Sequence, residues 1–182
     1  MISAFLAAVL ATTLPAGTLL SVDPGASFLR YHVTHKLHRV QGASTTIEGK
    51  AVVRDGQVVS MVRVPVASFR SGDANRDSHM QETLEAHKYP FIVWKGVAQL
   101  LADNALPAGP VTMQGQLEFH GVARAVSVPL TVEPGADGTV RVRGSLEIDL
   151  DAHRIDRPSL LFVKIDDMCR IELDLVLKAA KS

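Results

Sequence analysis

The chain has 182 residues, of which 47% are hydrophobic and 21% are charged. This is the composition of one domain that folds around an apolar core, and it excludes a disordered or low-complexity chain. The 19 Lys and Arg residues balance the 19 Asp and Glu residues, so the basic surface of a nucleic-acid-binding protein is not expected. The single cysteine, Cys169, cannot form an intrachain disulfide and lacks the clustered partners of a zinc site.

The N-terminal segment has the pattern of an export signal. Residues 2–22 carry no charged side chain, and the first half of this run is almost purely apolar, which is typical of a signal peptide. We expect a signal peptide over residues 1–20, a domain over residues 21–182, and a periplasmic or secreted location. A leader on a cytosolic protein remains the alternative. Pro15 and Gly17 interrupt the run before the roughly 20 apolar residues that cross a membrane, so stable membrane insertion is not expected.

Two segments alternate apolar with polar or small residues most regularly. They are residues 140–150, VRVRGSLEIDL, and residues 169–177, CRIELDLVL. Successive side chains of a strand point to opposite faces, so this alternation indicates strands with one apolar face. In a helix the same apolar positions would be spread around the whole cylinder.

The same alternation recurs more weakly in six further segments: 28–35, 47–55, 58–68, 91–101, 111–119 and 125–133. Turn-forming residues separate several of them, including Asp55-Gly56 and His120-Gly121, and short links of this kind join antiparallel strands. A single segment favours a helix, from Asp77 to His87. Ser78 and Gln81 could form its capping box, and Pro90 blocks its continuation.

Eight antiparallel strands predict an all-β fold, an eight-stranded antiparallel barrel with one short helix near its mouth. Closure into a barrel removes the exposed edges that an open sheet would present. An eight-stranded barrel can hold one small ligand or be filled by its own side chains. Aromatic residues make up only 5% of the chain, which favours a hollow interior, while a solid core remains the alternative.

The alternation also predicts which side chains face the barrel interior. We expect the following residues to line an apolar ligand site there: Leu29, Tyr31, Val33, Val64, Val66, Met113, Leu117, Phe119, Val128, Leu130, Val142, Leu146, Ile148, Ile171, Leu173 and Leu175.

Several local motifs resemble the YceI family of lipocalin-like barrels. The opening strand reads Tyr31-x-Val33-x-His35, and three further stretches are similar to family motifs: residues 68–80, SFRSGDANRDSHM; residues 84–90, LEAHKYP; and residues 117–124, LEFHGVAR. The resemblance implies a lipid-binding barrel that takes polyisoprenoids or other long-chain lipids. Without a glycine-rich phosphate loop, no cofactor is expected. One departure is the longer, basic connection over residues 152–161, where many members have an aromatic-Gly pair.

Polar residues near the predicted helix are candidates to hold the headgroup of an amphiphilic ligand. Arg76, Asp77 and His79 lie at the helix entry, and His35 and Tyr89 lie close to the same end of the barrel. In the alternative interpretation, Asp77 caps the helix and Arg76 ties the loop to the barrel rim. His35 shares the strand parity of Tyr31, so it should face inward, where it could bond a headgroup or a neighbouring side chain.

Catalytic and metal-binding motifs have little support in the sequence. His32, His35 and His38 recur every third residue, but on a strand His35 points away from the other two, so no metal site is expected. Cys169 sits on an apolar strand face, where burial should raise its pKa and leave it unreactive. No G-x-S-x-G or G-x-G-x-x-G motif occurs.

Three functions therefore remain open. The first is a non-enzymatic carrier or storage protein that shelters a long-chain amphiphile, such as a polyisoprenoid, an isoprenoid quinone or a fatty-acid-like molecule. The second is an enzyme acting on a lipophilic substrate, with His35, Asp77 and His79 as acid/base groups. The third is a filled barrel that works through its surface. A homodimer is compatible with each of them.

Overall fold

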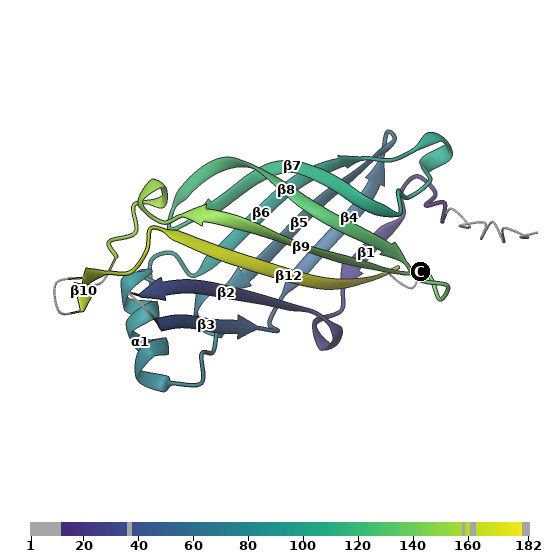
Figure 1. Cartoon of the computed structure of the whole chain (residues 1–182). Helices are drawn as coiled ribbons and strands as arrows, with labels where there is room; N and C mark the ends of the chain where they lie inside the picture. Colours follow the sequence, from purple (N-terminus) through teal and green to yellow (C-terminus); the bar gives the residue numbers. More distant parts are fainter. Residues whose placement is uncertain (1–11, 36–37, 158, 161–162, 180–182) are drawn as a thin grey trace, which may run out of the picture.

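A computed structural model describes residues 12–35, 38–157, 159–160 and 163–179 (Figure 1). The described residues contain one α-helix, α1 (Ala74–Thr83). The 3-10 turns are η1 (Pro24–Ala26), η2 (Val66–Ser68), η3 (Ala102–Asn104) and η4 (Asp151–His153). The strands are β1 (Leu19–Val22), β2 (Phe28–His35), β3 (His38–Ser44), β4 (Glu48–Arg54), β5 (Gln57–Pro65), β6 (Phe91–Gln99), β7 (Gly109–Phe119), β8 (Val122–Pro134), β9 (Thr139–Asp149), β10 (Ser159–Leu160), β11 (Val163–Lys164) and β12 (Met168–Ala179).

The main sheet closes on itself. Strands β1, β4, β5, β6, β7, β8, β9 and β12 follow one another in space, and β1 pairs with β12 as well as with β4. All these pairings are antiparallel, which confirms the predicted eight-stranded barrel with one short helix. No helix in the described part of the chain has the length and apolar character needed to cross a membrane.

The first strand of the barrel is interrupted, which the sequence did not predict. β1 pairs with the end of β12, where Val22 faces Leu177, and β2 continues along β12, where Phe28 faces Asp174. Between them lies η1, whose first residue is Pro24. Proline has no N–H to donate to a neighbouring strand, so the ladder breaks there. Residues 28–35 therefore form a strand as expected, but the barrel is closed by β1.

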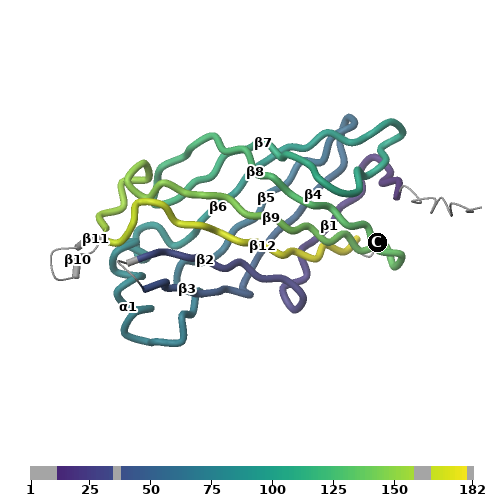
Figure 2. Tube along the Cα trace, viewed as in Figure 1, coloured from purple at the N-terminus to yellow at the C-terminus, as the bar shows by residue number. Residues whose placement is uncertain are grey.

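β2 also forms a hairpin with β3 that extends beyond the closed part of the barrel. Figure 2 shows this hairpin beside α1, at the end of the barrel opposite the C-terminus. We call this end, where α1 lies, the helix end. A bridge between Ala43 of β3 and Arg70 ties the hairpin to the segment that leads into α1.

The helix begins earlier than predicted. The side chain of Asp73 accepts a hydrogen bond from the backbone N–H of Arg76 at 3.0 Å, so Asp73 is the N-cap and Ala74 begins the helix. The predicted start at Asp77 and the Ser78–Gln81 capping box are wrong. The helix ends at Thr83, and Glu85 follows with a φ of 43°.

The predicted turns close two hairpins. Asp55 and Gly56 have φ values of 51° and 74°, and His120 and Gly121 have values of 51° and 70°. Two successive residues with positive φ define the turn that matches the twist of a two-residue hairpin. These turns set the register of β4 with β5 and of β7 with β8.

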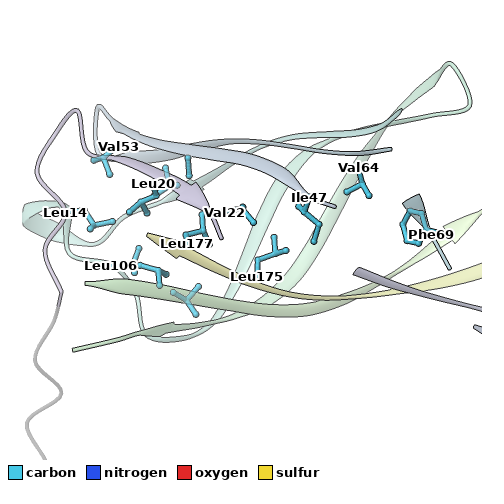
Figure 3. Packing of buried hydrophobic residues seen from close by; sticks show 14 residues of the cluster. Leu14, Leu20, Val22, Ile47, Val53, Val64, Phe69, Leu106, Leu175 and Leu177 are labelled. Atoms are coloured by element: carbon cyan, nitrogen blue, oxygen red, sulfur yellow. The ribbon is translucent and has the colours of Figure 1, made fainter. Parts of the chain in front are cut away.

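At the other end of the barrel, apolar side chains pack into a floor that we define by Leu14, Leu20 and Leu106 (Figure 3). The backbone N–H of Leu14 donates to the carbonyl of Asn104 at 3.1 Å, and Leu106 donates to Thr12 at 2.8 Å. Leu14 and Leu20 are 7% and 3% exposed. Residues 12–20, part of the predicted signal peptide, thus pack as a portion of the barrel.

Candidate functional site

The barrel encloses a cavity of about 840 Å³. This volume lies within the range of pockets that bury most of a drug-sized ligand. Aliphatic side chains from every strand of the closed barrel line it, and residues of α1 complete its wall at the helix end. The interior therefore contains open space, which favours the hollow barrel over the solid core.

The structure places the predicted inward residues, except Val66, on the cavity wall. These lining residues are Leu29, Tyr31, Val33, Val64, Met113, Leu117, Phe119, Val128, Leu130, Val142, Leu146, Ile148, Ile171, Leu173 and Leu175. Val66 lies off this wall because β5 ends at Pro65 and η2 begins at Val66. The Val66 side chain is 1% exposed, and its N–H donates to the carbonyl of Pro90 at 2.9 Å.

Several lining residues were missed in the sequence. Val62 and Val111 share the strand parity of the predicted residues, so extending the alternation by one step would have found them. Leu20, Met80 and Leu84 also line the cavity, but Leu20 falls within the predicted leader and the other two lie on or beside the helix. No period-two signal could have identified these three.

The polar part of the wall at the helix end comes from α1 and its N-cap. Arg76 and His79 line the cavity at the helix end, together with Asp73, Asn75 and Glu82. All five side chains are exposed, so the cavity reaches the surface beneath this helix.

Arg76 is also tied to the loop before the helix. Its Nε donates to Oγ of Ser71 and its Nη2 donates to the backbone carbonyl of Ser71, both at 2.9 Å. The guanidinium group thus holds the loop while lying on the cavity wall. The bonds to Ser71 match the structural alternative for Arg76, in which it secures the loop, and the headgroup role stays a prediction.

Asp77 does not line the cavity. Its side chain is buried, and Oδ1 accepts hydrogen bonds from the N–H of Ser71 at 2.9 Å and from Oγ of Ser71 at 2.5 Å. The helix-capping role expected for Asp77 belongs to Asp73. Asp77 and His79 therefore lie in different surroundings, one facing the loop and the other on the cavity wall.

Tyr89 lies away from the cavity wall. Its ring meets the imidazole of His120 edge-on, with centroids 4.7 Å apart. The ring also covers Gly121, where a Cβ would lie 2.5 Å from it. The remaining headgroup candidate, His35, ends β2 opposite His38, and its side chain lies outside the described part of the structure.

A second contact ties the segment after α1 to the barrel. Nε2 of His120, in the turn between β7 and β8, lies 3.0 Å from Oε2 of Glu85. The His120 side chain is 8% exposed. Together with the Asp77–Ser71 contact, this holds both ends of the helical segment over the cavity.

The sequence also predicted a buried, unreactive Cys169. Cys169 lines the cavity on β12, and burial raises the pKa of its thiol to about 12. A thiol with this pKa stays protonated and is a poor nucleophile at neutral pH. Among the described residues, no group of three or more His, Cys, Asp or Glu side chains is arranged to hold a metal ion.

A closed antiparallel barrel with an apolar internal cavity belongs to the class of small cavity-bearing β-barrels that includes the lipocalins. Within this class, residues 20–177 match the YceI-like domain. The chain therefore belongs to the YceI-like family, as its motifs indicated.

Solved structures share this fold at low sequence identity. BcnA of Burkholderia cenocepacia is 21% identical with a TM-score of 0.73, over 85% of this chain and 98% of that protein. A polyisoprenoid-binding domain from Saccharophagus degradans is 20% identical with a TM-score of 0.76, over 88% and 98%. The Campylobacter jejuni YceI protein is 21% identical with a TM-score of 0.51, over 68% and 73%. A search of curated protein sequences found no significant match.

Proposed function

We propose that the protein binds a long-chain amphiphile inside the barrel and shelters its tail from water, as a carrier or storage protein. The observation that supports this most directly is the apolar cavity of about 840 Å³, which runs from the floor to the polar residues of α1. The ligand classes that we propose are a polyisoprenoid, an isoprenoid quinone or a fatty-acid-like molecule. Similarity to a polyisoprenoid-binding domain adds support for the first of these.

Burial of the tail supplies enough free energy for such binding. Each buried CH₂ contributes roughly 0.8 kcal/mol, so a chain of about sixteen carbons offers roughly 13 kcal/mol of gross transfer free energy. A micromolar complex needs about 8 kcal/mol, and association with chain ordering opposes binding by several kcal/mol. Affinity therefore needs no tight fit, and we expect weak selectivity among tails of similar width.

The polar headgroup would lie at the helix end. Arg76 and His79 are on the cavity wall there and are exposed, so a headgroup beside them can keep contact with water while the tail enters the barrel. Asp77 and Tyr89 would support this end structurally, through Ser71 and His120.

Organic extraction of the purified protein, followed by lipid mass spectrometry, tests this function. A carrier purified from cells should yield a long-chain lipid in near-stoichiometric amount. A fluorescent apolar probe such as N-phenyl-naphthylamine should bind the extracted protein and be displaced by the recovered lipid. Protein that yields no lipid and does not bind the probe would overturn the proposal.

We also propose that the protein is exported, on the strength of its apolar N-terminal segment. Cell fractionation and the intact mass of the native protein test this. Because Leu14 and Leu20 pack into the floor, we expect a processed chain to begin at or before Thr12. Recovery of the full-length chain from the cytoplasm would contradict export.

A further inference from the structure

The one tryptophan of the chain lies along the inner wall of the barrel, and its ring packs against two glycines. Trp94 and Gly96 are on the same face of β6, and Gly96 pairs with Gly115 of β7. A Cβ at Gly96 would lie 2.3 Å from Cζ2 of the indole, and a Cβ at Gly115 would lie 2.5 Å from its Cη2. Both distances are too short for real atoms, so the ring occupies the space that side chains at these two positions would take.

A hydrogen bond holds the indole in this position. Nε1 of Trp94 donates to Oγ of Ser60 at 3.3 Å. Ser60 is the β5 neighbour of Gly96, and its hydroxyl in turn donates to the carbonyl of Gly96 at 3.2 Å. The polar edge of the ring is therefore bonded to the wall, and Trp94 and Ser60 both line the cavity.

We propose that Trp94, held against the wall by Gly96, Gly115 and Ser60, sets the internal width of the cavity and so admits a methyl-branched polyprenyl chain as well as a straight alkyl chain. This inference rests on the proposed function and deepens it. A side chain at position 96 would push the indole away from the two glycines and toward the centre of the barrel. The cavity would then be narrower beside Trp94. The wider, methyl-branched ligand tail would lose more affinity than the straight tail.

A purely structural role for the ring makes a different prediction. Aromatic rings that cover glycines stabilise sheets by shielding the exposed backbone. If Trp94 did only this, changes at Gly96 would lower stability but would weaken branched and straight chains equally. The ratio of the two affinities therefore separates width control from stabilisation.

Gly96→Ala tests the role of the Trp94 ring most directly, because its new methyl group meets that ring before any other atom. The three atoms that its new Cβ would meet at closest range all belong to the Trp94 side chain, whereas a Cβ at Gly115 would also lie 2.4 Å from the backbone carbonyl of Lys95. Farnesol and dodecanol make a matched pair of probes, because their main chains have the same length and only farnesol carries methyl branches. Displacement of N-phenyl-naphthylamine measures both affinities.

For Gly96→Ala we expect the Kd of farnesol to rise about tenfold and that of dodecanol to rise less than about threefold. In a Trp94→Leu background the same Gly96→Ala change should leave the affinity ratio unaltered, because no indole remains to be displaced. This double-mutant cycle assigns the effect to the contact between the two positions.

The wild-type protein provides a measurement that does not depend on a variant folding. Because the sequence has one tryptophan, its emission reports on the cavity wall at Trp94. Farnesol should change this emission with the same midpoint as probe displacement, and an unchanged emission during displacement would overturn the inference.

Two other results would also overturn it: equal weakening of both alcohols by Gly96→Ala, or a changed affinity ratio that persists in the Trp94→Leu background. If wild-type protein binds neither alcohol and no probe, the proposed function fails and this inference fails with it. If wild-type protein binds both alcohols and Gly96→Ala leaves their ratio unchanged, the inference alone fails.

Discussion

Leu173 shows how one side chain connects the strand pattern to the cavity. It lies on β12 opposite Leu29 of β2 and Gly144 of β9, and its side chain is on the cavity wall. The side chain is only partly buried, because open space replaces the atoms that would cover it in a solid core. The side chains around it on the cavity wall are apolar. The open space beside it leaves room for a larger side chain at this position.

We expect Leu173→Lys to prevent ligand uptake while leaving a weakened fold. An ammonium group in an apolar cavity lacks compensating partners, and the free space lets its stem move toward the helix end. Probe displacement and thermal melting measure the two effects. Val59→Lys is the matched control, since Val59 is 38% exposed on the outside of β5. Normal uptake by Leu173→Lys would contradict the inward placement of this residue.

The buried thiol of Cys169 makes stability depend on alkaline pH. Burial raises its pKa from 9.0 to about 12 in the folded protein. Above about pH 9 the unfolded chain loses this proton while the folded chain keeps it, so stability should fall with increasing pH, by at most about 1.4 kcal/mol per unit. Below about pH 9 the thiol is protonated in both states, so its contribution to the free energy of unfolding does not change with pH.

Urea unfolding between about pH 8 and pH 11 tests this, with Cys169→Ala as the comparison. The variant should start from a lower stability because it loses buried sulfur, but its stability should decline less steeply with pH. Parallel curves for the two proteins would show that the thiol ionises at the same pH in the folded and unfolded chains.

At the scale of elements, the segment that contains α1 covers the helix end of the cavity and is held by polar contacts. Asp77 accepts two hydrogen bonds from Ser71, and His120 contacts Glu85. The helix presents polar side chains such as Arg76 and His79 to the cavity end. Met80 and Leu84 of the same segment also pack against the apolar core. The polar contacts fix the two ends of the segment, so they should control how quickly a ligand leaves.

Asp77→Ala should accelerate ligand release several-fold. It removes the acceptor of two partly buried hydrogen bonds from Ser71, at a cost of about 1–3 kcal/mol. Stopped-flow release of N-phenyl-naphthylamine measures the rate. Asp137 is a matched control, because its Oδ1 also accepts bonds from the N–H and hydroxyl of one residue, Thr139, at the far end of the barrel. Equal acceleration in Asp137→Ala would show that release reflects general loosening.

At the scale of the whole molecule, closure by β1 and the unfilled cavity have opposite effects on stability. Pairing of β1 with both β4 and β12 leaves no free edge in the closed part of the sheet. The cavity of about 840 Å³ means that its wall lacks the contacts of a filled core. A ligand tail in the cavity restores these contacts, so ligand binding should raise the stability of the folded state.

The extracted protein should therefore melt at a lower temperature than the protein as purified. A ligand present at about 100 times its Kd stabilises the folded state by about 2.7 kcal/mol, and each kcal/mol shifts Tm by about 2–4 °C at this size. We expect saturating farnesol to raise Tm by about 5–10 °C in a calorimetric scan. An unchanged Tm would mean that the alcohol does not bind the folded barrel selectively.

The alternating segments predict most of the barrel, but two local predictions are wrong. The Ser78–Gln81 pair suggests a capping box and hence a helix from Asp77, whereas the cap is Asp73. The alternation continues past the end of β5 and so predicts that Val66 lines the cavity, which it does not. For the helix the choice between caps is local, since Asp73 bonds the N–H of Arg76 three residues on. For Val66 a distant contact decides, because its N–H bonds the carbonyl of Pro90.

The sequence by itself determined most of the barrel strands, the two-residue turns and most of the inward side chains, because alternation and positive φ are local properties of the backbone. Only the tertiary structure decided where the first strand breaks, how Leu14 packs beside Leu106, and that the Trp94 ring rests on Gly96 and Gly115. These features join residues far apart in the chain. The space left inside a barrel depends on such distant contacts, and no local pattern encodes it.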